Sequence, residues 1–423
     1  MINGFDNGSL GHSRLNNSSN HPAYDWIPDK LASLRKAHWY RQVQMLDGAS
    51  GPVVHVNGRP CLNFASNDYL GLASDARLVE AARRGAERYG TGSSGSRLLS
   101  GHRPIHADLE QALARLKHTA DALVFSSGYL ANLGAIATLV SSRDLILTDQ
   151  YNHASLKAGA RLSGATVMAY PHGDVVMLSQ FLAMHRAQYR RCLIVTDGVF
   201  SMDGDLCPLP QILDLADQHC AMTLVDDAHG TGVLGQTGAG CAEQLGCTGR
   251  AMIQVGTLSK ALGSLGGFIA GSAPLIDLLR NRASSWIYTT GLSPAAAASA
   301  RCALDILQRE PARLARLAQN RQYLSQRLTA ALAELPQPQS ADAGPPLQLL
   351  PSDSPIFCLQ VRDAATVRSL GQQLIDRGIL AAAVRPPTVP TSRLRLTVMA
   401  THEQTHLDQL VEQLVCCVET GGG

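Results

Sequence analysis

The sequence lacks any strong imbalance of charge and any long uninterrupted apolar run. Its 423 residues contain 36 Lys and Arg against 34 Asp and Glu, which gives a formal net charge of +2 at pH 7. Such a small excess does not indicate a nucleic-acid or membrane surface, so an anionic ligand must be met by local groups. No run approaches the roughly 18 apolar residues of a membrane span, and residues 1–20 lack the apolar core of a secretory signal. We therefore expect a cytoplasmic protein that contacts neither nucleic acid nor membrane.

Cysteine pairs with metal-ligand spacing are also lacking. The ten cysteines follow neither a zinc-site pattern nor the compact framework of a small secreted protein. Most of them lie among apolar residues, which indicates small core side chains in a reducing compartment. We therefore expect no metal site.

The composition is that of a globular protein, with 45% hydrophobic and 17% charged residues. A chain of this length can bury a large core in two or three domains. We expect a disordered extension over residues 1–25, an N-terminal arm over 26–75 with a helix over Asp29–Met45, a large domain over 76–300 and a small domain over 301–423.

From about Ala107, short apolar strands alternate with helical stretches. This alternation predicts an α/β fold with a mostly parallel sheet and helices on both faces. Ligands bind such sheets at the carboxyl ends of the strands. The predicted strands are Ala122–Phe125, Leu145–Thr148, Thr166–Ala169, Leu193–Thr196, Met222–Val225, Met252–Val255 and Gly267–Ala270.

The last part of the chain predicts a smaller α+β domain. It begins with a long helical stretch and a Pro- and Ser-containing linker, and then strands and helices follow. The expected elements are a helical stretch over Pro294–Leu335, a linker over Pro336–Pro355, strands over Ile356–Val361, Ile379–Val384 and Leu394–Val398, a helix over Ala364–Arg377 and a final helix from His402.

Polar residues follow three of the predicted strands. Gly128 and Tyr129 open a helix after one strand, where free backbone N–H groups can bind an anion such as a phosphate. His153 follows another strand and is either a helix-start residue with a local hydrogen bond or a ring that stacks on a flat cofactor. Ser201 lies in a segment after a further strand that is dense in turn residues, which indicates a tight surface turn held by the apolar side chains of Phe200 and Met202.

Asp226 and His229 give a stronger indication. A carboxylate directly after a strand lies at the floor of the cleft, and it can pair with a protonated pyridine nitrogen. A metal site or a hydrolytic triad is the alternative, but the third ligand and the Ser of a nucleophile elbow are both missing.

Lys260 follows another predicted strand and has apolar neighbours at Leu258, Ala261 and Leu262. It is either a surface lysine or, in an apolar pocket, an amine that loses its proton and forms an imine. Thr257 offers a hydroxyl to a phosphate. Together, an anion site, a stacking ring, a buried carboxylate and an amine are what pyridoxal 5'-phosphate requires.

Five segments carry a resemblance to a known family: Ser66–Leu72, Gly198–Asp205, Val225–Val233, Thr257–Lys260 and Arg385–Pro390. With these segments, the chain from about Arg41 to its last helix resembles the α-oxoamine synthases. These are pyridoxal-phosphate enzymes with the aspartate-aminotransferase-like (type I) fold. The resemblance implies a homodimer whose sites form at the subunit interface.

The resemblance also implies residue roles. Lys260 is similar to the Schiff-base lysine, Asp226 to the partner of the pyridine nitrogen, His229 to the partner of the ring 3-hydroxyl, and His153 to the stacked histidine. The other implied contacts are with phosphate at Gly128, Tyr129, Thr257 and, from a neighbouring subunit, Thr289, with the cofactor at Ser201, with the substrate carboxylate at Asn67 and Arg395, and with the acyl donor or substrate at Arg41, Arg385 and Thr388.

The implied reaction is a decarboxylating condensation of an amino acid with an acyl thioester. The segment Arg385–Pro390 resembles the version that joins L-alanine to a pimeloyl group, carried by CoA or a carrier protein, in biotin biosynthesis. Sister activities remain open, namely glycine C-acetyltransferase, 5-aminolevulinate synthase and serine palmitoyltransferase. Two different classes are also open: a non-catalytic subunit, which the presence of Lys260 disfavours, and a metal hydrolase built on Asp226, Asp227 and His229.

Overall fold

The computed structural model describes residues 21–335 and 347–420 and contains two compact units, residues 1–43 and 44–423. The expected extension over residues 1–25 lies outside the described residues except for 21–25. The expected linker over Pro336–Pro355 lies outside them except for 347–355, which contain the short strand Gln348–Leu349. Within the described ranges, no helix has the length and apolar character needed to cross a membrane. The division into a large and a small domain at residue 300 stays a prediction.

The N-terminal unit contains a short 3-10 helix, η1 (Pro22–Tyr24), and α1 (Trp26–Lys36). The helix predicted for Asp29–Met45 is therefore wrong in its second half. His38 has a φ of 58°, a left-handed conformation in which an α-helix cannot continue.

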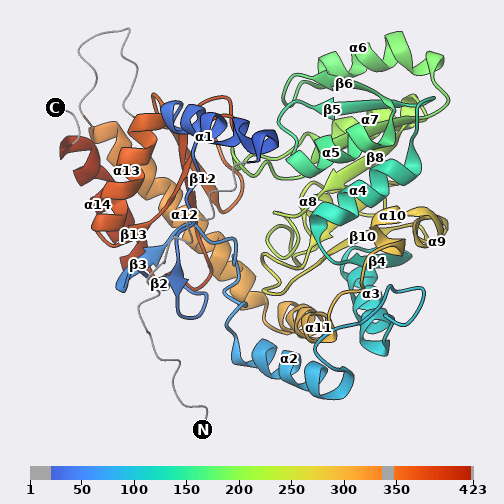
Figure 1. Ribbon diagram of the computed structural model, residues 1–423, viewed down its shortest axis with the longest axis horizontal. Helices are drawn as coiled ribbons and strands as arrows, with labels where there is room; N and C mark the ends of the chain where they lie inside the picture. Colours follow the sequence, from blue (N-terminus) through green and yellow to red (C-terminus); the bar gives the residue numbers. More distant parts are fainter. Residues whose placement is uncertain (1–20, 336–346, 421–423) are drawn as a thin grey trace. The chain divides into compact units, whose positions relative to one another are not determined.

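A seven-stranded sheet with the order β4-β10-β9-β8-β7-β5-β6 forms the centre of the second unit (Figure 1). All seven predicted strands are present, and only β10 runs antiparallel to its neighbours β4 and β9. The strands are β4 (Asp121–Phe125), β5 (Leu145–Asp149), β6 (Thr166–Tyr170), β7 (Cys192–Asp197), β8 (Met222–Asp226), β9 (Ile253–Thr257) and β10 (Gly267–Gly271).

Apolar side chains on both faces of the sheet explain why these strands are continuous apolar runs in the sequence. In β5, Ile146 packs in the cluster that contains side chains of α4 and α5, whereas Leu145 and Leu147 pack with α6 and α7 on the other face. Helices connect most of the strands, and further helices precede β4 or follow β10. The helices are α2 (Ala76–Tyr89), α3 (Pro104–Leu116), α4 (Gly128–Leu139), α5 (Ala154–Ser163), α6 (Val175–His185), η2 (Arg186–Gln188), α7 (Leu209–Gln218), α8 (Cys241–Gln244), α9 (Ala273–Arg282), α10 (Ser284–Ile287) and α11 (Pro294–Arg309).

Two smaller sheets complete this unit. The first has the order β11-β12-β15-β14 and packs against three helices, and the second has the order β1-β2-β3-β13. The strand predicted for Ile379–Val384 is wrong as a single element, because its two halves pair in different sheets. The elements are β1 (Leu46–Asp47), β2 (Val53–Val56), β3 (Arg59–Asn63), β11 (Gln348–Leu349), β12 (Ile356–Gln360), β13 (Ile379–Leu380), β14 (Ala382–Val384), β15 (Arg393–Thr397), α12 (Pro311–Glu334), α13 (Ala364–Asp376) and α14 (Gln404–Thr420).

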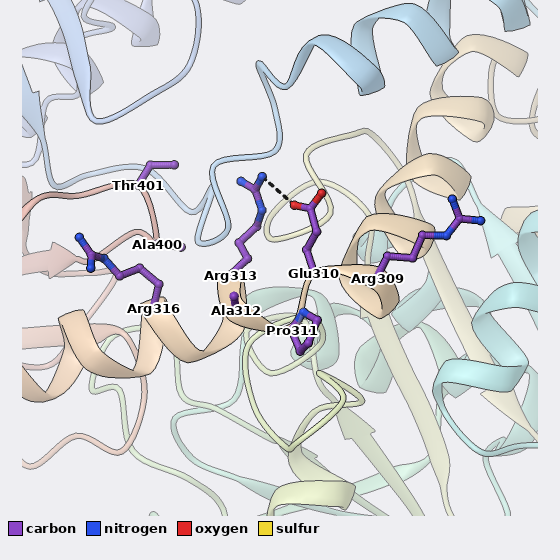
Figure 2. A pocket seen from close by; sticks show the side chains of 8 residues that line it. All are labelled: Arg309, Glu310, Pro311, Ala312, Arg313, Arg316, Ala400 and Thr401. Atoms are coloured by element: carbon purple, nitrogen blue, oxygen red, sulfur yellow. Dashed lines mark hydrogen bonds and ion pairs between the residues drawn. The ribbon is translucent and has the colours of Figure 1, made fainter.

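The helical stretch predicted for Pro294–Leu335 is broken between α11 and α12. Pro311 has no backbone N–H and disfavours helical geometry at Glu310, whose φ and ψ are −121° and 63°. Figure 2 shows the pocket of about 520 Å³ at this break, where Arg313 pairs with Glu310 at 3.2 Å. Arg313 also donates to the Leu70 carbonyl at 3.0 Å, so the start of α12 is tied to the loop before α2.

Candidate active site

The carboxyl ends of the parallel strands bring three of the chemically important positions to one edge of the sheet. Asp197, Asp226 and Thr257 are the last residues of β7, β8 and β9. Asp197 and Asp226 are direct neighbours in the register of β7 and β8. This edge is where an open α/β sheet binds its ligands.

Lys260 lies in the loop that connects β9 to β10. Its neighbours Leu258, Ala261 and Leu262 are buried, as the sequence predicts. Gly263 has a φ of 59°, and a Cβ there would lie 2.6 Å from the Ala73 nitrogen, so this loop fits closely against the backbone before α2. Burial lowers the pKa of Lys260 to about 8, although Asp226 opposes the shift.

His229 faces Lys260 directly. The distance from Lys260 Nζ to His229 Nε2 is 2.8 Å. His229 is buried, and burial, followed by the positive charge of Lys260, lowers its pKa well below the ordinary value. The ring is therefore neutral near pH 7, with one nitrogen as donor and the other as acceptor.

A chain of hydrogen bonds connects Asp226 to His153. Asn132 Nδ2 on α4 lies 2.6 Å from Asp226 Oδ2 and 2.9 Å from Ser155 Oγ. Ser155 Oγ in turn lies 2.7 Å from His153 Nδ1. The second carboxylate oxygen of Asp226 accepts from the Ala228 N–H at 3.0 Å, so both oxygens are oriented.

His153 lies at the start of α5 with its ring partly buried, and its backbone fixes it to the same edge. Its N–H donates to Asp197 Oδ2 at 2.7 Å. Burial lowers the pKa of the His153 ring. Burial, followed by the charge of Asp226, raises the pKa of Asp197 well above its ordinary value.

The predicted anion site lies at the start of α4. A Cβ at Gly267 would lie 2.3 Å from the Gly128 nitrogen, so the absence of a side chain lets the helix start approach β10. A Cβ at Gly128 would fill the space beside Thr257, 3.7 Å from its hydroxyl oxygen. Tyr129 is 46% exposed on the first turn. The Thr257 hydroxyl here donates to the Gly266 carbonyl at 2.9 Å.

Asn67 and Arg395 are 328 positions apart in the sequence, yet they form a pair. Arg395 Nη2 donates to Asn67 Oδ1 at 3.1 Å, and Arg395 Nε donates to the Ser201 carbonyl at 2.6 Å. The structure therefore brings together these three predicted substrate and cofactor contacts. A buried guanidinium of this kind can bind a carboxylate through two parallel hydrogen bonds.

Four predicted residues belong to other segments of the chain. Arg385 and Thr388 share one turn after β14, where the Thr388 N–H donates to the Arg385 carbonyl at 3.1 Å. Thr289 follows α10 and precedes Thr290, which bridges to Ser96. Arg41 belongs to the N-terminal unit. Their roles stay predictions.

A buried ion pair involves Asp227, the residue that follows Asp226. Lys117 Nζ lies 2.6 Å from Asp227 Oδ2, and both side chains are almost completely buried. The ammonium also donates to the Thr231 hydroxyl at 3.3 Å. Asp227 therefore has a structural partner, which separates its role from that of Asp226.

Another imidazole is held between two carboxylates near His153. His172 Nδ1 lies 3.1 Å from Asp149 Oδ1, and its Nε2 lies 2.9 Å from Asp205 Oδ2. The ring stacks on Tyr151, with 4.6 Å between centroids. Burial alone would lower the pKa of His172, but hydrogen bonds to both carboxylates raise it to about 10. His172 is therefore a cation that connects β5 to the loop containing Ser201.

Replacing His172 with Gln should destabilise the protein in a pH-dependent way. Because the folded pKa is about 10 and the unfolded pKa about 6.5, the stabilisation is complete below pH 6.5 and is lost as pH rises to 10. We expect the variant to have a free energy of unfolding about 1.5–3 kcal/mol lower than that of the wild type at pH 6.5, the range for hydrogen bonds to charged groups. Urea unfolding of the wild type and the variant at pH 6.5, 8 and 9.5 measures this difference in the free energy of unfolding. The exposed His55→Gln variant is the control, and a difference that grows with pH would contradict the assignment.

Sequence reasoning missed Tyr69, Asn132, Ser155 and Asp197. Asn132 had one available signal, because it is an amide within the apolar helix segment Gly128–Leu139. Asp197 also had one, because it ends a buried strand as Asp226 does. Tyr69 and Ser155 act through contacts with distant loops, which no local pattern indicates.

Comparison with known proteins gives one family. The sequence matches the family described as aminotransferase class I and II over residues 59–414. A protein of Nostoc punctiforme named "Putative 8-amino-7-oxononanoate synthase" is 59% identical over 391 residues, which cover 92% of this chain and 96% of the relative.

Two solved structures are similar over most of the chain. A serine palmitoyltransferase variant of S. paucimobilis with a bound PLP–myriocin aldimine has a TM-score of 0.86 at 28% identity, covering 95% of this chain and 98% of the other. The 8-amino-7-oxononanoate synthase of Francisella tularensis has a TM-score of 0.71 at 28% identity, covering 86% and 99%.

Proposed function

Because this chain belongs to the aminotransferase class I and II family, we propose that it condenses L-alanine with a pimeloyl thioester to form 8-amino-7-oxononanoate, with release of carbon dioxide and the free thiol. The chain is an enzyme, a pyridoxal-phosphate-dependent acyltransferase of the α-oxoamine synthase family. The observation that carries the proposal is the placement of Lys260 Nζ, 2.8 Å from His229, at the strand edge that also contains Asp226. The proposed setting is biotin biosynthesis in the cytoplasm.

The residues at this edge fit the cofactor. The start of α4 with Gly128, Tyr129 and Thr257 would hold its phosphate, because helix N–H groups and the helix dipole favour an anion. Lys260 Nζ would hold it covalently, and Asp226 would keep its ring nitrogen protonated. When bound, pyridoxal phosphate supplies a ring that accepts the electron pair left at the Cα of the amino acid.

The proton at Cα would be moved by Lys260. An amine with a pKa near 8 is partly unprotonated close to neutral pH, so Nζ can accept the proton and later return it. His229 is neutral because it is buried beside Lys260, and its N–H or lone pair can meet the 3-oxygen of the ring. His153 would cover one face of the ring.

The carboxylate of L-alanine would bind to Arg395 and Asn67. Ser201 holds Arg395 through its backbone carbonyl, so the guanidinium is oriented before substrate arrives. Arg41, Arg385 and Thr388 would contact the acyl donor, carried by CoA or by a carrier protein. We propose a homodimer in which Thr289 of one subunit reaches the phosphate held by the other.

A substrate panel tests this proposal. L-Alanine, glycine and L-serine are each supplied with acetyl-, pimeloyl- and palmitoyl-CoA, and thiol release is followed. We expect L-alanine with pimeloyl-CoA to give the highest kcat/KM, by about 10- to 200-fold over amino acids that differ by one small group.

Two other outcomes of the panel identify the sister enzymes. Serine with palmitoyl-CoA is the second candidate, because the TM-score with serine palmitoyltransferase exceeds that with the F. tularensis enzyme. Preference for that pair, or for glycine with acetyl-CoA, would overturn the proposed substrates while leaving the family unchanged.

A further inference from the structure

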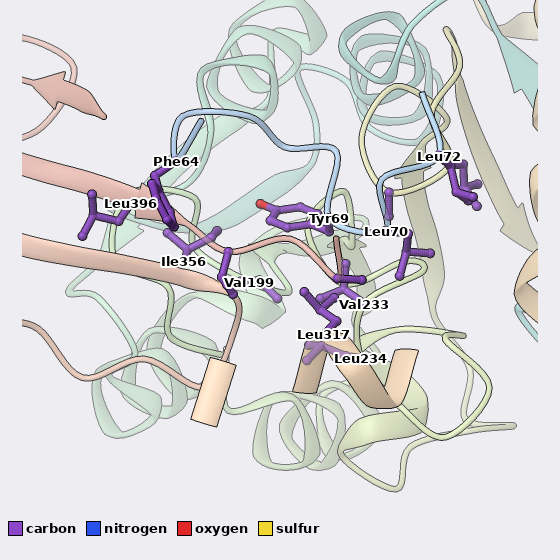
Figure 3. Packing of buried hydrophobic residues seen from close by; sticks show 14 of the residues in the cluster. Phe64, Tyr69, Leu70, Leu72, Val199, Val233, Leu234, Leu317, Ile356 and Leu396 are labelled. Atoms are coloured by element: carbon purple, nitrogen blue, oxygen red, sulfur yellow. The ribbon is translucent and has the colours of Figure 1, made fainter. Parts of the chain in front are cut away.

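Tyr69 is a fully buried tyrosine whose hydroxyl points into the site. Its ring projects from the loop before α2 into the apolar cluster that includes Val199, Leu396 and Leu70 (Figure 3). At the other end, its hydroxyl oxygen lies 2.7 Å from His229 Nδ1. The ring thus holds a single polar atom at the far side of His229 from Lys260.

His229 therefore has a partner at each nitrogen. Nε2 meets Lys260 Nζ at 2.8 Å, and Nδ1 meets the Tyr69 hydroxyl. A neutral imidazole carries one proton, so only one of these contacts can have the ring as donor. The position of that proton decides whether His229 presents an acceptor or an N–H to Lys260 and to the cofactor beside it.

Lys260 sets the proton's position while it is an ammonium ion. An ammonium can only donate, so Nε2 must accept and the ring proton lies on Nδ1, from where it donates to Tyr69. Tyr69 can then donate to Asn67 Oδ1, which lies 3.3 Å away. That bond is long, so this arrangement depends on the charge of Lys260 to maintain it.

The arrangement reverses when Lys260 is uncharged, as a free amine or in its bond to the cofactor, because its nitrogen then has a lone pair that can accept a hydrogen bond from Nε2. Nothing then requires Nε2 to accept. The hydrogen bond from the Tyr69 hydroxyl to Nδ1 is 2.7 Å long, whereas the bond to Asn67 Oδ1 is 3.3 Å long. The shorter hydrogen bond is the stronger of the two. Arg395 also interacts with the Tyr69 oxygen and can only donate to it.

We propose that Tyr69 is a positioning residue that lets His229 change tautomer with the state of Lys260. Its hydroxyl accepts from Nδ1 when Lys260 is charged and donates to Nδ1 when Lys260 is not, and the second state turns Nε2 into an N–H donor toward the cofactor. The ring holds one proton in both states. This inference rests on the proposed roles of Lys260 and His229 but not on which amino acid or thioester is the substrate.

The tautomer can be observed without substrate. The full-length protein without cofactor, labelled with ¹⁵N-histidine, is titrated from pH 6.5 to 9.5, and a His229→Gln spectrum assigns the signals. We expect the His229 proton to move from Nδ1 to Nε2 as Lys260 loses its proton, near pH 8. The other charged or titratable groups that face Lys260 and His229 are Asp226, Asp197, Arg395 and His153. A proton that stays on Nδ1 over the whole range would overturn the proposal.

The Tyr69→Phe variant keeps the buried ring and removes only the hydroxyl. We expect its His229 to lose the pH-dependent tautomer change. In the holoenzyme we expect kcat to fall about tenfold, the value of one hydrogen bond, and the absorbance titration of the bound cofactor to shift, with KM for the amino acid changed less than about twofold.

The matched control is Tyr170→Phe, a buried tyrosine in the separate cluster around α6 and α7. We expect it to leave the tautomer, the absorbance titration and kcat unchanged. A purely structural role for Tyr69, exerted through Arg395, would instead raise KM with kcat and the cofactor titration unaffected, and that result would contradict the proposal.

Discussion

Replacing Lys260 with Ala should abolish the imine absorbance of the bound cofactor and reduce thiol release by at least about 10²- to 10⁴-fold. The first effect follows because Lys260 is the amine that faces His229 at this edge, and alanine has no group that can form the covalent bond. The second follows because the variant loses the group that moves the Cα proton, and general bases contribute about that factor. Absorbance spectra and a thiol assay with saturating L-alanine and pimeloyl-CoA measure both.

Lys157→Ala is the control for this variant. Lys157 lies on α5 close to His153, and its ammonium donates to the Gln150 carbonyl at the surface. We expect it to retain the imine absorbance and near-normal turnover. Full thiol release by Lys260→Ala would refute both the covalent role and the proton-transfer role assigned to Lys260.

Replacing Asp226 with Asn should reduce kcat/KM by roughly 30- to several-thousand-fold, with the fold retained. The amide keeps the shape of the carboxylate but removes the charge that holds a proton on the ring nitrogen. Truncating one partner of a buried charge pair costs about 2–5 kcal/mol, which gives this range of rates. Steady-state kinetics and urea unfolding of the variant are the two measurements.

The neighbouring Asp227→Asn variant separates activity from stability. Asp227 pairs with the buried Lys117, so losing its charge leaves an ammonium unpaired in the interior. We expect a loss of about 3–5 kcal/mol of folding free energy. If Asp226→Asn unfolded as easily as Asp227→Asn and kept its activity per folded molecule, Asp226 would be a structural residue.

The sheet could be predicted from the sequence because both of its faces are buried. Residues such as Leu145 and Ile146 are apolar whichever face they occupy, so β5 is a continuous run with clear ends. Pairing was not predictable at Ile379–Val384, because apolar character does not determine which strand will be the neighbour. The break at Ala381 sends the two halves to different sheets.

The candidate site was predictable where chemistry follows a strand directly, as at Asp226 and Lys260. It was not predictable where a polar group acts from another part of the fold. Tyr69 reaches His229 across 160 positions of sequence, and Asn132 reaches Asp226 across 94. In the sequence, Tyr69 is a single aromatic residue in a loop and Asn132 is a single amide in a helix. Neither residue lies in a local pattern that indicates its partner.

The single antiparallel strand of the central sheet, β10, limits the conformational freedom of the loop that contains Lys260. A parallel neighbour would have required a long crossover back to the opposite edge, but β10 returns at once, and residues 258–266 close the connection between Thr257 and Gly267. A short segment with both ends fixed, such as residues 258–266, has few accessible conformations, so the position of Lys260 within it is restricted. Insertions in residues 258–266 should therefore weaken the bond between Lys260 and the cofactor before they lower the melting temperature of the protein. This turn is thus a poor place for engineered extensions.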